Sequence, residues 1–179
     1  MKLYTSPFNS LLPHPAMLIV GLILLMHSCL NEEVCEDVAT VPVRIGFYQM
    51  EAEEEDPQIL AIDSLTVFGV GNDSIIYQNR FNVSRIELPL NSAIDSCAFV
   101  FVLPSHEPGL LPAADTVWFH YRILPNLISM ECGFVSFYEL NTITHTRYNI
   151  DSLSIETPSI TNTQDEHIKI FPFISADDR

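Results

Sequence analysis

Histidines and serines are the side chains of this sequence most suited to catalysis, and their spacing does not indicate an active site. His106, His120, His145 and His167 lie far apart, without the short intervals typical of metal-binding histidines. The sequence contains no His-Glu-x-x-His, Cys-x-x-Cys, Gly-x-Ser-x-Gly or glycine-rich phosphate-binding motif. We therefore predict a protein that is not an enzyme and that uses no cofactor or metal ion.

Glu51–Asp56 is the densest acidic stretch, with five carboxylates in six residues. Such a cluster can attract Ca²⁺, but it lacks the ordered alternation of ligands and the turn glycine of a dedicated calcium-binding loop. We interpret it as the solvated tip of a hairpin. Calcium binding at Glu53–Asp56 is the alternative.

Cys29 is a candidate for covalent modification because it follows the longest apolar run. The run Ala16–Met26 has 11 uncharged residues, whereas a membrane-spanning helix needs roughly 20. We therefore interpret residues 1–28 as a signal peptide. Ser28 directly before the cysteine resembles the lipobox of bacterial lipoproteins, which predicts lipidation of Cys29. The alternative is an ordinary cleaved signal peptide, after which Cys29 joins a disulfide.

Three further cysteines, Cys35, Cys97 and Cys132, would lie in an oxidising compartment. Cys97 belongs to an apolar run, where a thiol behaves as a small buried hydrophobe. We predict a Cys35–Cys132 disulfide that holds an acidic tether, residues 29–40, to the domain. In the chain-entropy model, closing a loop of about 100 residues gives roughly 4.7 kcal/mol. Three free thiols, or a pair that includes Cys97, are the alternatives.

The charge of the chain excludes one class of partner. Removal of residues 1–28 removes one lysine and no acid, so the net charge of −15 becomes −16. A surface this acidic repels nucleic acid. Because 47% of the residues are hydrophobic, the acidity does not indicate disorder. We expect a folded domain that does not bind nucleic acid.

From Val41 onward, short β-branched and aromatic runs alternate with Asn, Asp, Pro and Gly, which predicts an all-β fold. The expected strands are Val41–Tyr48, Leu65–Val70, Ile75–Tyr77, Asn82–Leu88, Ala98–Leu103, Thr116–Ile123, Ile128–Leu140, Leu153–Thr157 and Ile168–Phe173. The pattern predicts one antiparallel β-sandwich, immunoglobulin-like or related, of about 8–9 strands over residues 41–175.

Trp118, Tyr121 and Arg122 are candidate binding residues because their types are enriched at binding hot spots. Alternate residues of a strand face opposite sides. Trp118 and Arg122 therefore share one face, and Tyr121 shares the other with Val117 and Phe119, which we expect to form the core. Burial of the strand is the alternative to a binding role.

A short signature recurs at Ile62-Asp63-Ser64-Leu65, Ile94-Asp95-Ser96-Cys97 and Ile150-Asp151-Ser152-Leu153, with Asp115-Thr116-Val117 as a variant. An Asp followed by Ser or Thr can bond the local backbone and fix the entry into a strand, which is the interpretation we favour. The alternative is modification, because several of these sites resemble the O-glycosylation acceptor pattern of secreted Bacteroidetes proteins.

The chain resembles an uncharacterised Bacteroidetes envelope lipoprotein family of unknown function. Besides Cys29 and Cys35, the likeness rests on Val41–Tyr48, Ile62–Val67, Leu88–Asn91 and Ser129–Gly133. It covers nearly the whole mature chain and implies a lipid-anchored envelope β-domain without catalytic residues. The acids behind Cys29 also resemble the surface-export tags of such lipoproteins.

We accordingly expect a domain anchored by lipid to the outer membrane, on its periplasmic or surface face. There it would bind an envelope protein or a glycan, or serve as an accessory subunit. The alternative is a calcium-dependent or carboxylate-based hydrolase acting on envelope polymer, since carboxylates distant in sequence can meet in a fold.

Overall fold

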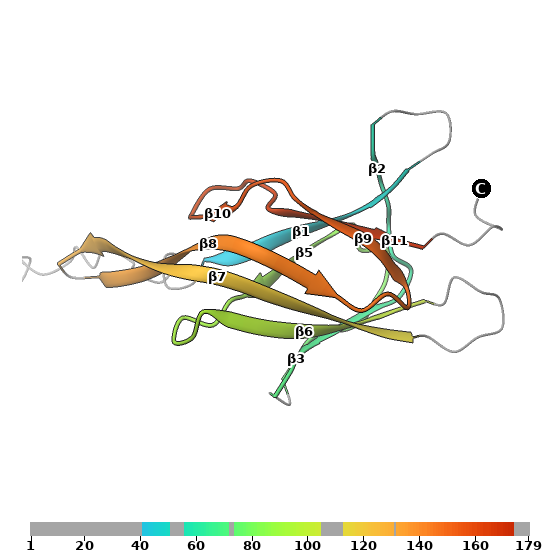
Figure 1. Cartoon of the computed structure of the whole chain (residues 1–179), viewed down its shortest axis with the longest axis horizontal. Coiled ribbons are helices and arrows are strands. Elements are labelled where there is room, and N and C mark those ends of the chain that lie inside the picture. The colour runs from blue at the N-terminus through green and yellow to red at the C-terminus, as the bar shows by residue number, and fades with distance from the viewer. Residues whose placement is uncertain (1–40, 51–55, 72–73, 105–112, 131, 174–179) are drawn as a thin grey trace, which may run out of the picture. The chain divides into compact units, whose positions relative to one another are not determined.

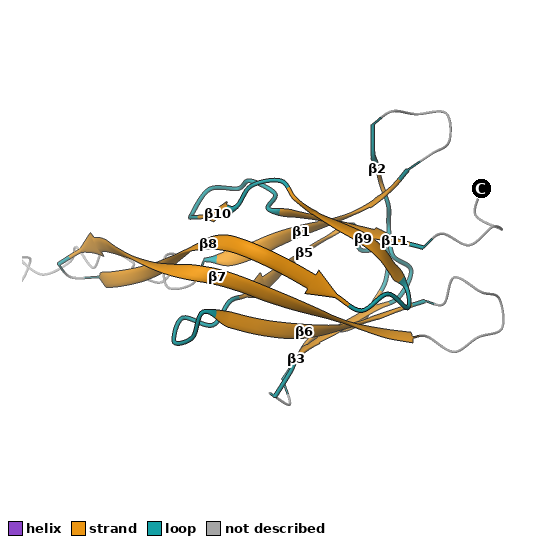
Figure 2. Cartoon of the chain, in the orientation of Figure 1, coloured by secondary structure: helices purple, strands orange, loops and turns teal. Residues whose placement is uncertain are grey.

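Strands are the only regular secondary structure in the part of the chain that the computed structural model describes, residues 41–50, 56–71, 74–104, 113–130 and 132–173 (Figures 1 and 2). The eleven strands are β1 (Pro42–Gln49), β2 (Gln58–Ile59), β3 (Leu65–Gly69), β4 (Ile75–Arg80), β5 (Arg85–Pro89), β6 (Ser96–Leu103), β7 (Ala113–Ser129), β8 (Gly133–His145), β9 (Ile150–Ile155), β10 (Ser159–Ile160) and β11 (Ile168–Pro172). The predicted all-β class is confirmed. The strand count exceeds the expected 8–9 because β2 and β10 have two residues each, too few for a sequence pattern.

The strands form two sheets, as a β-sandwich requires. One sheet has the order β2–β1–β11–β9, with β5 also paired to β1, and the other has the order β10–β8–β7–β6–β3–β4. One pairing differs from the antiparallel prediction, because β1 and β11 are parallel, with Ile45 opposite Ile168. A parallel pair needs a long crossover connection. Here nine intervening strands supply it.

Both sheets contribute to a single cluster of buried apolar side chains. In β1 the predicted alternation is correct, since Val43, Ile45 and Phe47 are fully buried. In the other sheet, Phe99 and Phe119 meet edge to face with ring centroids 5.8 Å apart, a favoured aromatic geometry. Burial of these strand faces is the main force that holds the sheets together.

The predicted single strand Ile128–Leu140 is wrong, because the chain reverses near its start. β7 ends at Ser129 and β8 begins at Gly133, with these two residues opposite each other. Gly133 has φ +72°, a conformation that glycine adopts without steric cost. The backbone N–H of Cys132 also donates to Ser129 Oγ at 3.0 Å. Strand-forming residues on both sides, such as Ile128 and Phe134, concealed this turn.

The interpretation of the Asp-Thr signature predicted that Asp115 bonds the backbone next to it. The structure shows that Asp115 bonds a distant segment instead. Its carboxylate is fully buried and accepts hydrogen bonds from the backbone N–H groups of Tyr148, Asn149 and Ile150 at 2.8, 2.6 and 2.9 Å. The hydroxyl of Thr146 donates a fourth hydrogen bond, at 2.7 Å. Asp115 therefore fixes the connection between β8 and β9 to β7, more than 30 residues away along the chain.

Membrane attachment was predicted through lipid and not through a helix. Within the described ranges, no helix is long and apolar enough to cross a membrane. The predicted signal peptide, Cys29 and the tether lie outside the described residues.

Candidate functional site

A polar cleft of about 690 Å³ lies on the face of β1 and β5 that points away from the core. Its lining comes from β1, β4, β5 and the segment before β11: Arg44, Ile45, Tyr77, Arg85, Ile86, Glu87, Gln164, Asp165 and Glu166. The alternation of β5 accounts for this arrangement, because Ile86 is buried whereas Arg85 and Glu87 are exposed. The sequence therefore places opposite charges two residues apart on one strand face.

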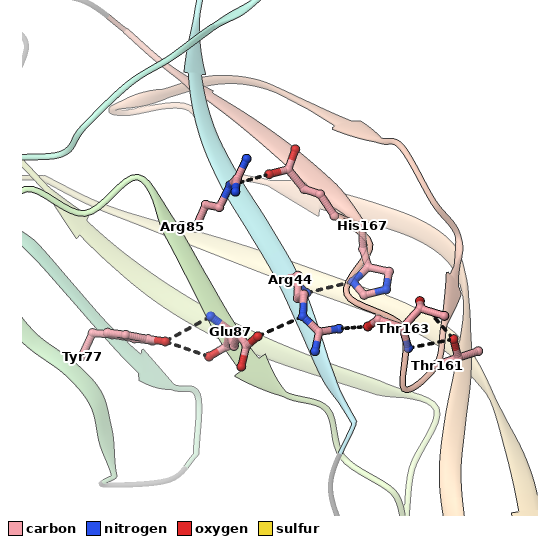
Figure 3. A network of polar contacts seen from close by, with 8 residues as sticks. Arg44, Tyr77, Arg85, Glu87, Thr161, Thr163 and His167 are labelled. Carbon is pink, nitrogen blue, oxygen red and sulfur yellow. Dashed lines mark hydrogen bonds and ion pairs between the residues drawn. The ribbon is translucent and has the colours of Figure 1, made fainter. Parts of the chain in front are cut away.

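Arg44 connects three parts of the cleft (Figure 3). Its Nε donates to Glu87 Oε1 at 2.9 Å, and its Nη1 donates to the backbone carbonyl of Thr163. Its backbone N–H donates to His167 Nδ1 at 2.9 Å. Arg44 thus holds β1 to β5 and to the segment that precedes β11.

His167 supports the cleft from inside the core. It is fully buried, and because its Nδ1 accepts a hydrogen bond from Arg44, the neutral ring carries its proton on Nε2. Burial lowers the pKa of His167, and the nearby charge of Arg44 lowers it further. Among the residues that the structure describes, Nε2 has no hydrogen-bond partner, which adds to the cost of burying this side chain.

Glu166 occupies space that a glycine leaves open. Its Oε1 accepts a hydrogen bond from the Tyr48 hydroxyl at 2.8 Å, and its Oε2 lies 3.5 Å from Arg85 Nε. A Cβ at Gly46 would come within 2.6 Å of Tyr48 Cε2 and closer still to Glu166 Oε2. Burial raises the pKa of Tyr48, and its hydrogen bond to Glu166 raises it further. The absence of a side chain at Gly46 therefore positions this carboxylate.

Tyr77 brings β4 of the second sheet to the cleft. Its hydroxyl donates to the backbone carbonyl of Glu87 at 3.1 Å and accepts from the backbone N–H of Glu87 at 3.0 Å. These two bonds fix the phenol ring beside β5 (Figure 3). The cleft therefore has one aromatic wall.

The arrangement suits a neutral, polar ligand with many hydroxyl groups. Arg85 is 67% exposed, and its distance from Glu166 exceeds that of a normal hydrogen bond. Glu87 is also exposed. A hydroxyl group can accept from a guanidinium and donate to a carboxylate at the same time. Neither an anion nor a cation would match a lining that contains both signs of charge.

The predicted binding residues do not lie together. Tyr121 is fully buried, and its hydroxyl donates to the backbone carbonyl of Asn91 at 2.9 Å, so it does not belong to an exposed binding surface. Burial raises the pKa of Tyr121. Trp118 and Arg122 are exposed on the opposite face of β7, as the alternation predicted. None of the three lines the cleft.

The cysteines separate into two environments. Cys97 is a free thiol, and burial raises its pKa, as expected for a thiol in an apolar run. Cys132 is not among the free thiols of the described residues. Cys29 and Cys35 lie outside the described residues, so the Cys35–Cys132 pairing stays a prediction.

The predictions about metal ions are tested only in part. Among the described residues, no group of three or more His, Cys, Asp or Glu side chains could hold a metal ion. The acidic stretch Glu51–Glu55 and His106 lie outside these residues. Of the predicted hairpin around the acidic stretch, the pairing of β1 with β2 is present, with Tyr48 opposite Ile59.

The cleft was not predicted from the sequence, although part of its signal was present. Arg44 and the Arg85, Glu87 pair are charged positions within otherwise apolar strand patterns, which indicates a polar outer face. The pairing of Arg44 with Glu87 spans 43 residues, and that of Tyr48 with Glu166 spans 118. No local pattern predicts such distant partners.

The fold and the cleft together define an all-β, two-sheet domain with a charged groove on one outer face. The chain belongs to a family of unknown function, DUF6452, whose family model matches residues 64–172. This range contains β3–β11 and leaves β1 and β2 outside. No curated protein and no solved structure matches the chain.

Proposed function

We propose that this protein is a lipoprotein of a Bacteroidetes-type cell envelope, attached to the outer membrane through lipid on Cys29, and that its β-domain is a binding module without catalytic activity. The lipid attachment rests on the apolar run and the lipobox-like end of the predicted signal peptide. A Cys35–Cys132 disulfide would hold the tether to the domain. Intact-mass analysis of native material tests both features, because unmodified Cys29 or a retained leader excludes the anchor.

The ligand that fits the cleft best is a short glycan. The observation that carries this proposal is the alternation of guanidinium and carboxylate groups along the lining, from Arg85 through Glu87 to Arg44. Sugar hydroxyls can bond both kinds of group, and the Tyr77 ring offers an apolar surface against which a sugar ring could pack. An accessory role beside an envelope protein is compatible with this activity.

The test is an NMR titration of the uniformly labelled domain with defined oligosaccharides, including peptidoglycan tetrasaccharide. We expect saturable shifts at the backbone amides of β1 and β5, and their loss in Arg85→Ala and Glu87→Gln. Arg122→Ala is the matched control, because Arg122 is equally an exposed arginine on a strand but lies outside the cleft. Shifts that persist in both cleft variants would exclude this site.

The same samples test the hydrolase alternative. Glu87, Asp165 and Glu166 bring three carboxylates to one cleft, which is the observation in favour of that activity. If the wild-type chain shortens the oligosaccharides after prolonged incubation and Glu166→Gln does not, the domain is an enzyme and the proposal of a binding module without catalytic activity is refuted. Calorimetry with CaCl₂ tests the calcium-dependent version.

A further inference from the structure

The β7–β8 hairpin extends beyond the rest of its sheet (Figure 1). β6 pairs with β7 only from Ala113 to His120, and β10 pairs with β8 only at Tyr138 and Glu139. Beyond these positions, and apart from a hydrogen bond from the backbone N–H of Tyr121 to the carbonyl of Asp95, the only strand pairing that the described residues show for β7 and β8 is with each other, as far as Ser129 and Gly133. One face of this ribbon contributes Val135 to the core, with Ile128 packed against it, whereas the other face presents side chains to the surroundings.

The end of this hairpin is apolar and exposed. Leu127 and Phe134 face each other across the two strands, and they are 49% and 74% exposed. Met130, in the turn, is 86% exposed. We call these three side chains the hairpin tip. Apolar side chains that are exposed together mark a site of interaction with a protein or a membrane.

The charge pattern favours lipid as the occupant. The chain carries a net charge of −15, yet residues 123–138 include one charged residue, Glu131. A docking surface for a polar partner would normally carry a rim of charges that fixes orientation. A ribbon with a single charged residue and an apolar end is instead suited to the boundary between lipid head groups and acyl chains.

The position of the hairpin agrees with this occupant. β1 begins at the end of the domain from which the hairpin extends (Figure 1). At the same end, the backbone carbonyl of Leu90, one residue after β5, accepts a hydrogen bond from the Tyr138 hydroxyl of β8. Only 11 residues separate Cys29 from Val41, counted from 30 to 40, a connection that spans at most about 40 Å. Cys132 lies in the turn, and its predicted partner is Cys35. A bond to Cys35 would place the turn within roughly 20 Å of chain from Cys29.

We infer that the hairpin tip inserts into the membrane that holds the anchored chain, with Leu127, Met130 and Phe134 in contact with phospholipid. This inference rests on the proposed lipid attachment of Cys29. The tip and the anchor then form two points of contact, which orient the domain and direct β2 and the opposite end of the sheets away from the membrane.

The two methionines of the mature chain provide a test without any substitution in the hairpin. Met130 lies in the tip, and Met50 directly follows β1, whose end lies away from the hairpin (Figure 1). Both side chains are exposed, at 86% and 54%. The experiment measures peroxide oxidation of each by peptide mass spectrometry. It compares the native lipidated chain in phosphatidylcholine vesicles with an unlipidated Cys29→Ser chain in solution.

We expect Met130 to be oxidised several-fold more slowly in vesicles than in solution, and Met50 to be oxidised equally fast in both. Equal rates at Met130 in a chain that floats with the vesicles would overturn the inference and leave the anchor intact. A native chain that does not float would instead refute the proposed anchor. Protection of Met130 that grows with protein concentration in the absence of vesicles would identify a second copy as the occupant and overturn the inference.

A reporter at the tip gives an independent measurement. In a Trp118→Phe background, Met130→Trp is compared with Tyr148→Trp, which is also exposed but lies in the connection after β8. With acyl-brominated phosphatidylcholine, we expect Met130→Trp to lose about half its emission, since interfacial segments reach roughly 5–10 Å into the head-group and acyl boundary. Tyr148→Trp should keep its emission. Equal quenching of the two reporters, or none at Met130→Trp, would contradict insertion.

Discussion

Replacement of Asp115 by asparagine should be among the most destabilising single-atom changes in this domain. The two carboxylate oxygens accept four hydrogen bonds, two each, from three backbone N–H groups and the Thr146 hydroxyl. Asparagine retains one oxygen and places an NH₂ group against two donors. Hydrogen bonds to a charged group contribute about 1.5–3 kcal/mol each, so the loss of two gives a decrease in unfolding free energy of about 3–6 kcal/mol.

The assay is urea unfolding of Asp115→Asn followed by circular dichroism. Asp151→Asn is the matched control, because Asp151 is partly exposed and pairs with Arg147 on the surface, where an ion pair contributes about 0–1 kcal/mol. If Asp115→Asn does not fold, Thr146→Val removes a single donor to the same carboxylate and should cost about 1–3 kcal/mol. Equal unfolding free energies for wild type, Thr146→Val and Asp151→Asn would refute the reasoning.

Three further predictions concern the cleft and the core. Gly46→Ala should lower the unfolding free energy by about 1–3 kcal/mol, because the added methyl group overpacks this position. NMR should also show that the Tyr48 hydroxyl no longer bonds Glu166, and an unchanged Tyr48 resonance would contradict this prediction. Because the pKa of His167 is lowered on folding, protons bind the unfolded chain preferentially once the pH falls below about 6.5, and stability should decrease by up to about 1.4 kcal/mol per pH unit. Urea unfolding at pH 7.5 and 5.5 measures this slope, which His167→Gln should reduce. Because burial raises the pKa of Cys97, its thiol should react with a disulfide reagent at pH 8 more slowly in the folded chain than in urea; equal rates would contradict its burial.

Sequence patterns predicted the features of this fold that depend on neighbouring residues. The alternation in β1 and β7 correctly placed Val43, Ile45 and Phe119 in the core, because a strand turns successive side chains to opposite faces. The turn between β7 and β8 was missed, although Gly133 was its signal. Strand-forming residues on both sides of Gly133 do not by themselves distinguish one long strand from two paired strands.

Features that depend on distant residues could not be predicted in this way. The parallel pairing of β1 with β11 joins Ile45 to Ile168, and the cleft depends on the same pairing, since Arg44 meets His167 through it. Sequence alone showed that Arg44 occupies a polar strand face. The partners of Arg44 depend on the order of the strands in the sheet. The same strands could be arranged in many other orders, each of which would give Arg44 different partners.

The position of β1 has a consequence for how the family domain is defined. The family model begins at Ser64, yet β1 lies between β5 and β11 and joins both. Without β1, the facing edges of β5 and β11 would lose their hydrogen-bond partners, and unpaired strand edges favour aggregation. The core would also lose the fully buried Val43 and Phe47. The folding unit therefore begins before the matched range, at β1, and the cleft belongs to that complete unit because Arg44, Gly46 and Tyr48 all lie on this strand.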